Sequence, residues 1–149
     1  MPKSTKSSLF PDVNVWTALT YERHVHHRVA TMWFESLGSS TRVFFCRVTQ
    51  LGLLRLLTTE AVMGEEEVMS QAEAWEAYDR WLQDDRVTFL AEPPGIEEAF
   101  RAWSRSARPA PKDWADSYLA AFASTANLTL VTFDRALRSK AEHSLILTP

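Results

Sequence analysis

The chain alternates between short runs of apolar residues and longer stretches in which apolar residues recur every three or four positions. The short runs fall at Ser8 to Pro11, Val43 to Cys46, Val87 to Leu90, Leu128 to Phe133 and Leu145 to Leu147. Short apolar runs that end at polar or turn residues are typical of buried strands, and the stretches between them are typical of helices with one apolar face. The pattern predicts an α/β fold built from βαβ units around a mostly parallel sheet.

Three of the periodic stretches carry an apolar face that is predicted to pack into a core. These faces are Ala30, Trp33, Phe34 and Leu37; Ala72, Trp75, Tyr78 and Leu82; and Leu119, Phe122, Ala123 and Ala126. The breaks at residues 92–95 and 108–111 are loops, because neither is long or polar enough to be a linker. With 149 residues the chain is predicted to form a single domain over 1–149, with residues 1–7 as a flexible tail.

The composition indicates the cellular compartment and the kind of partner to expect for this domain. The longest apolar stretches are far shorter than the roughly 20 residues that span a bilayer, and no secretion signal follows the basic N-terminus. Cys46 is the only cysteine, so no intramolecular disulfide can form, which fits a reducing cytoplasm. Since the net charge is −3, any nucleic-acid partner must be held by local groups and not by a global basic field.

Three aspartates fall at positions that a parallel sheet would bring together. Asp12 ends the first predicted strand, Asp134 ends the strand from Leu128, and Asp116 follows the predicted helix N-cap Asp113 by three residues. In a parallel α/β sheet the carboxyl ends of the strands and the amino ends of the helices share one edge, where ligands bind. Each aspartate alone could simply cap a helix. Their joint occurrence favours a shared site.

Several carboxylates at one edge would repel one another and raise each other's pKa unless a cation neutralised them. Mg²⁺ suits such a place because it takes oxygen ligands and needs only one or two protein carboxylates. A divalent ion of this kind supports attack of water on a phosphodiester. The acidic edge therefore predicts metal-dependent phosphodiester hydrolysis.

The same residues make the chain resemble the PIN-domain ribonucleases and, among them, the VapC-type toxins of bacterial toxin–antitoxin pairs. The similarity extends over nearly the whole chain. It rests on the segments Leu9 to Trp16, His24 to His27, Val48 to Arg55, Asp116 to Ala121 and Leu130 to Arg135.

This resemblance implies a PIN-like three-layer α/β/α sandwich with a central parallel sheet. It also implies a Mg²⁺ or Mn²⁺ site at Asp12, Asp116 and Asp134, with Asp12 and Asp116 as the expected direct ligands. The implied activity is endonucleolytic cleavage of RNA. The implied partners are a small antitoxin and a second copy of the chain in a homodimer.

One position departs from the family pattern. Relatives usually carry an acid in the helix after the second strand, and the matching residue here is taken to be Gln50, which is counted as a catalytic-site residue. A glutamine carbonyl can contact a cation but binds Mg²⁺ more weakly than a carboxylate does. An alternative is therefore a catalytically impaired relative that acts by binding RNA or an antitoxin.

Several neighbours of the acids are candidates for supporting roles. Asn14 could orient a ligand, the Thr132 hydroxyl could hold a ligating carboxylate, and Arg135 lies where substrate phosphates must pass. Trp114 could stack on an unpaired base or pack on a helix. The cations Arg105, Arg108, Lys112, Arg138 and Lys140 are expected to be solvated individually, as are Glu60 and Glu65.

Other site types fit the sequence less well. His24, His26 and His27 do not have the i, i+4 spacing of helical metal ligands, so a structural role is expected. A phosphatase of the haloacid dehalogenase type needs a second acid where this chain has Asn14. A receiver domain lacks the paired acids that precede its phosphorylated aspartate.

Overall fold

The computed structural model describes residues 7–141 and 143–148 and contains one five-stranded parallel sheet. The strands are β1 (Ser8–Pro11), β2 (Arg42–Phe45), β3 (Val87–Phe89), β4 (Thr129–Thr132) and β5 (Ser144–Ile146). Their order is β3-β2-β1-β4-β5, and every neighbouring pair runs parallel. The predicted α/β class is therefore confirmed. Residues 1–6 of the predicted tail lie outside the described part, whereas the Ser7 carbonyl accepts a 2.8 Å hydrogen bond from the backbone of Arg42.

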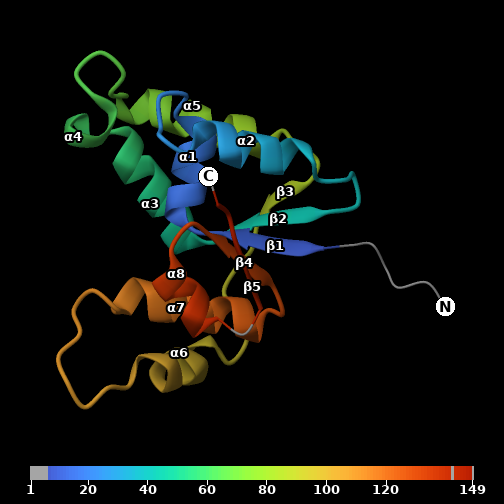
Figure 1. Ribbon diagram of the computed structural model, residues 1–149, viewed down its shortest axis with the longest axis vertical. Helices are drawn as coiled ribbons and strands as arrows, with labels where there is room; N and C mark the ends of the chain where they lie inside the picture. The colour runs from blue at the N-terminus through green and yellow to red at the C-terminus, as the bar shows by residue number, and fades with distance from the viewer. Residues whose placement is uncertain (1–6, 142, 149) are drawn as a thin grey trace.

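Helices cover both faces of the sheet. They are α1 (Val13–Thr20), α2 (His27–Glu35), α3 (Arg47–Leu57), α4 (Glu60–Met63), α5 (Gln71–Leu82), α6 (Ile96–Ser104), α7 (Trp114–Thr125) and α8 (Arg135–Lys140). Figure 1 shows α1 to α5 above the sheet and α6 to α8 below it. This arrangement is the predicted three-layer α/β/α sandwich. No helix in the described ranges is long and apolar enough to cross a membrane.

Each face of the sheet has its own core. On the side of α1 to α5, the fully buried Trp16 stacks on Phe45 with ring centroids 3.8 Å apart. On the side of α7 and α8, Phe10 of β1 stacks on Phe122 at 4.9 Å. The central strand β1 thus supplies side chains to both cores, and its alternation fixes which residue faces each layer.

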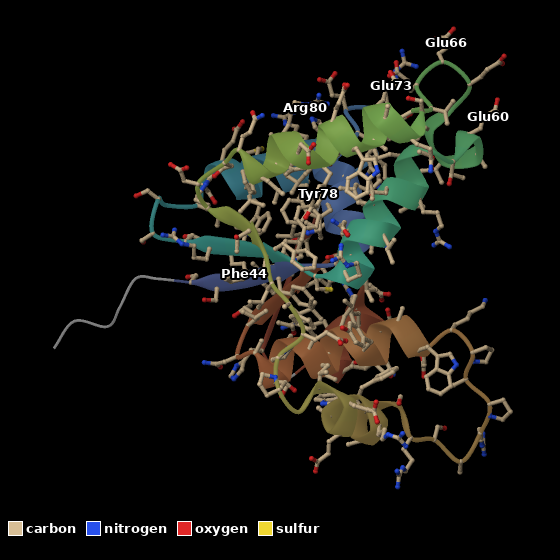
Figure 2. All side chains as sticks on the ribbon, turned by 180° about the vertical axis from the view of Figure 1, so that it is seen from behind. Phe44, Glu60, Glu66, Glu73, Tyr78 and Arg80 are labelled. Carbon is tan, nitrogen blue, oxygen red and sulfur yellow. The ribbon has the colours of Figure 1, made fainter. Side chains whose placement is uncertain are left out.

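Two of the three predicted helix faces are confirmed, and the second is wrong. On α5 the buried residues are Ala74, Ala77 and Tyr78, whereas Trp75 and Leu82 are 48% and 38% exposed. Figure 2 shows Tyr78 pointing from α5 toward the sheet. Two alanines on the inner face let α5 approach the core closely. Tyr78 and Trp81 pack there, whereas Trp75 and Leu82 remain partly exposed.

The predicted strands are confirmed, but most of their ends differ by one residue. Cys46 is not the end of β2 but the N-cap of α3, where the Thr49 hydroxyl accepts a hydrogen bond from its backbone N–H. Leu90, Phe133 and Leu147 likewise lie just beyond their strands. A strand ends where its hydrogen bonds to the neighbouring strand stop, but the apolar residues continue for one more position, so the apolar pattern misplaces the strand end.

Helices α1 and α3 touch at a glycine. A Cβ atom built on Gly52 would lie 2.5 Å from Cγ2 and 2.9 Å from Cγ1 of Val13. Val13 is the first residue after Asp12, so this close approach brings α3 next to the carboxyl end of β1. The contact leaves no room for a side chain at position 52.

We expect Gly52→Ala to lower the free energy of unfolding by about 1–3 kcal/mol, because the stiff β-branched Val13 cannot easily move away. Urea unfolding of the variant measures this loss. In a Val13→Ala background the same substitution should become neutral or stabilising, since alanine is the better helix former by about 1 kcal/mol. Gly38→Ala, where nothing lies within 4 Å of the added Cβ, is the matched control. An equal loss in the Val13→Ala background would contradict the steric explanation.

Candidate active site

The acidic residues gather where the strand order changes direction. From β1 the chain adds β2 and β3 on one side of the sheet and then crosses to β4 and β5 on the other. Such a switch point opens a crevice at the carboxyl ends of the strands. Asp12 follows β1, and Asp134 follows the adjacent strand β4.

Asp12 is held at the switch point by three hydrogen bonds. Its backbone N–H donates to the Val131 carbonyl at 2.9 Å, which extends the ladder between β1 and β4. Its Oδ1 accepts from the backbone N–H of Val15 at 3.0 Å and caps α1. Its Oδ2 accepts from the Thr132 hydroxyl at 2.5 Å. Asp12 is only 4% exposed. Each of its carboxylate oxygens accepts one hydrogen bond, which leaves one lone pair on each for a further ligand.

Burial raises the pKa of Asp12 from 3.8 to about 6. Loss of hydration is the main cause, because it penalises the charged carboxylate. The hydrogen bonds from Thr132 and Val15 pull the pKa down, and the negative charges of Asp116 and Asp134 push it up. The charged form of Asp12 is therefore destabilised near neutral pH by the loss of hydration and by the two neighbouring carboxylates.

Asp116 and Asp134 complete the acidic set. Asp116 lies in the first turn of α7, and its pKa is raised by partial burial, then by the charges of Asp134 and Asp113, with Lys140 opposing them. Asp134 is exposed and caps α8 through a 2.8 Å hydrogen bond from the N–H of Ala136 to Oδ1. The Thr132 hydroxyl accepts from the N–H of Asp134 at 2.9 Å and donates to Asp12, so one side chain positions both acids.

All three aspartates line one hollow of about 520 Å³. Its lining residues come from α1, α3, α7 and α8 and the turns before them: Asp12, Val13, Asn14, Val48, Leu51, Gly52, Arg55, Leu56, Ala115, Asp116, Leu119, Asp134 and Leu137. Figure 1 shows the helices that supply this lining, with α3 above the sheet and α7 and α8 below it. The three acids selected from the sequence therefore line the same hollow.

Gln50 is placed elsewhere. It is buried outside this lining, and its Oε1 accepts a 2.6 Å hydrogen bond from Arg47. The wall that α3 presents to the acids consists of Val48, Leu51, Gly52, Arg55 and Leu56. This wall has no carboxylate and carries one guanidinium. Its members recur at the spacing of a helix face, which is the signal that would have pointed to Gly52 and Arg55.

Of the other candidate residues, Asn14 lines the hollow, whereas Arg135 and Trp114 do not. Asn14 lines the hollow and is exposed. Arg135 is exposed and lies next to Asp134 in the chain, outside the lining. Trp114 is 59% exposed and contacts Phe100 edge to face, with ring centroids 6.1 Å apart, also outside the lining.

The histidines have structural contacts, as predicted. His27 Nδ1 donates to the carbonyl of Ala18 at 2.7 Å, and His24 Nδ1 accepts from the backbone N–H of His26 at 3.0 Å. The His26 ring stacks on Phe133 at 4.5 Å. These bonds hold the turn between α1 and α2. Glu60 and Glu65 are exposed, as expected for surface residues.

The donor set fits a hard divalent cation. Asp12 and Asp116 both have raised pKa values and face one hollow, so a cation between them would relieve their repulsion. No three His, Cys, Asp or Glu side chains within residues 7–141 and 143–148 are arranged to hold one ion together. Mg²⁺ requires no such cluster, because it binds through one or two carboxylates and keeps several waters.

Comparison with known proteins agrees with this geometry. The family model of the PIN domain matches residues 9–143. The chain is 45% identical to Ribonuclease VapC41 of Mycobacterium tuberculosis over 131 residues. The aligned region covers 86% of this chain and 90% of VapC41.

Two solved structures share the fold at lower sequence identity. One is VapC20 of Mycobacterium tuberculosis, described as a Sarcin-Ricin loop cleaving toxin. It matches with a TM-score of 0.65 and 17% identity, and the match covers 89% of this chain and 94% of the VapC20 chain. VapBC2 from Rickettsia felis, solved with a DNA fragment from its promoter, has a TM-score of 0.67 at 10% identity, with 94% and 98% covered. The family match and the 45% identity together place the chain in the PIN-domain family, among the VapC-type proteins.

Proposed function

We propose that this protein is an endoribonuclease that hydrolyses phosphodiester bonds in RNA with a bound Mg²⁺ or Mn²⁺ ion. The observation that carries the proposal is the set of Asp12, Asp116 and Asp134 in one hollow at the switch point, in a chain of this family. VapC41, its relative at 45% identity, is named a ribonuclease, and the similarly folded VapC20 is described as a toxin.

In this proposal Asp12 and Asp116 hold the cation, because they are the two acids whose pKa is raised by burial and by neighbouring negative charges. When bound, such an ion stabilises negative charge that develops on the phosphate. Thr132 keeps the Asp12 carboxylate in a single orientation, so the remaining lone pairs point in fixed directions. Asp134 keeps one oxygen outside its helix-capping bond and can orient a water molecule at the open side of the hollow.

The supporting residues have smaller roles. Asn14, on the exposed rim of the hollow, can donate to a phosphate oxygen, and Arg135 adds positive charge beside Asp134. Gln50 has no part in the proposed chemistry, because its carbonyl is bonded to Arg47 outside the hollow. The impaired-relative alternative rested on Gln50, and the set of three aspartates is complete without it.

The proposed partners follow from the family. Structural neighbours include the VapBC2 assembly, so we include a small antitoxin that blocks the activity in the cytoplasm, and a homodimer as the working form. Analytical ultracentrifugation of the purified chain, alone and with the product of an adjacent short gene, measures both associations.

Cleavage of single-stranded RNA by the purified chain tests the function itself. We expect cleavage with Mg²⁺ or Mn²⁺, none with a chelator, and recovery when the ion is restored. RNA binding without cleavage under every metal condition would favour the non-catalytic alternative. Cleavage that persists in the chelator would contradict the metal requirement.

A further inference from the structure

A second hollow, with a mostly apolar lining, adjoins the acidic hollow along α3. The second one, of about 350 Å³, lies between α3 and α5, and Leu51 and Arg55 line both. Its other lining residues are uncharged and include Trp75, whose side chain is 48% exposed. No carboxylate lines this second hollow in the described part of the chain. The two hollows therefore adjoin at Leu51 and Arg55. Together they are called the groove here, with an acidic part on one side of Arg55 and an apolar part on the other.

Arg55 is available to bind an anion from outside the protein. It is exposed on α3, and it faces the hollow that holds three carboxylates. Its guanidinium nevertheless makes no ion pair or hydrogen bond with another residue of the described ranges. A planar guanidinium matches the geometry of a phosphate and can bind two of its oxygens.

Trp75 gives the apolar part of the groove a stacking surface. The indole of Trp75 is half exposed beside α3 and is not part of the core, to which α5 contributes Ala74, Ala77 and Tyr78. Aromatic side chains beside a cationic groove bind the bases of unpaired nucleotides by stacking. The adjacent phosphate would then lie near Arg55, and the next one would lie toward the aspartates.

We infer that the groove between α3 and α5 binds the nucleotide next to the cleaved bond of a single-stranded RNA, with Arg55 on its phosphate and Trp75 on its base. This inference rests on the proposed ribonuclease function and names the residues that hold its substrate. Two features favour RNA as the occupant: the hollow between α3 and α5 shares Leu51 and Arg55 with the acidic hollow, and the only charged lining residue beyond the aspartates is a cation.

Binding can be measured without cleavage in an Asp116→Asn background. The probe is a fluorescein-labelled single-stranded RNA of about 12 nucleotides and mixed sequence. Arg55→Gln should weaken binding and reduce the slope of log K against log salt by about 0.7, as expected for one lost phosphate contact, and Arg55→Lys should retain most of that slope. Trp75→Leu should weaken binding about fivefold or more, whereas Trp75→Phe should retain most of it.

Two control variants change an exposed arginine and an exposed apolar side chain elsewhere on the surface. Arg28→Gln removes an exposed arginine of α2, and Leu82→Ala shortens an exposed apolar side chain of α5, both outside the groove. Neither should alter RNA affinity. An abasic RNA series adds a sharper test: with the base absent at one position, Trp75→Leu should cause no further loss.

The outcomes separate this inference from the function on which it rests. If the parent chain cleaves RNA while Arg55→Gln and Trp75→Leu bind it like the controls, the groove assignment is wrong and the ribonuclease function stands. If those variants keep RNA affinity but lose affinity for the antitoxin, the groove belongs to the protein partner and the inference is again wrong. If the parent neither binds nor cleaves RNA, both proposals fail.

Discussion

Asp116→Asn and Asp12→Asn should each reduce the rate of RNA cleavage by more than about a hundredfold. Removal of a residue that only supports a metal ligand typically costs 10- to 100-fold, so loss of a direct ligand should cost more. Both substitutions keep the size of the side chain, and Asn remains a good N-cap at position 12. The measurement is single-turnover cleavage at saturating Mg²⁺, together with Mg²⁺ affinity by calorimetry.

The matched control is Asp79→Asn, which removes an exposed carboxylate of α5 far along the chain from the three acids. It should leave cleavage and Mg²⁺ affinity unchanged. Residual activity of the Asp116 and Asp12 variants at the level of the parent would indicate a contaminating nuclease. It would remove the central support for the proposed site.

The metal-free protein should lose stability as pH rises from about 4 to about 7. The pKa of Asp12 is about 6 in the folded chain and 3.8 in the unfolded reference, so the folded state binds more protons between these values. The stabilisation from the protonated carboxyl is complete below pH 3.8 and is lost as pH rises through 6. The difference corresponds to at most about 3 kcal/mol. The raised pKa of Asp116 acts in the same direction.

Urea unfolding in a chelator at several pH values measures this effect. Asp12→Asn should flatten the curve and make the metal-free chain more stable than the parent near pH 7.5, because a neutral amide has no charge to desolvate. Mg²⁺ should stabilise the parent much more than this variant, since binding to the folded state alone raises its stability. Parallel pH curves for parent and variant would show that Asp12 is not the group responsible.

The architecture and the three acids were predictable because both follow from periodic features. Strand ends in a parallel sheet share an edge, so Asp12 and Asp134 could be located from the apolar runs that precede them. Asp116 followed from its place in the first turn of a helix. These arguments need no knowledge of side-chain packing.

The wall of α3 was not predictable in the same way. Gln50 was taken as the position that matches the family's acid. It is buried outside the hollow with its carbonyl bonded to Arg47, whereas Gly52 of the same helix lies against Val13 and lines the hollow. The rotation of α5 was missed for a similar reason. Its small residues pack inward so that Trp75 lies outside, although size and hydrophobicity alone would bury the indole.

The hydrogen bond from Thr132 to Asp12 joins residues that lie 120 positions apart. Contacts of such long range form only after the intervening chain has been made and its loop closed. A nascent chain that has just folded β1 to β3 therefore displays Asp12 but lacks β4, Thr132 and Asp134. Each new molecule therefore acquires its complete set of acids only after the ribosome has passed residue 134, long after Asp12 has been made.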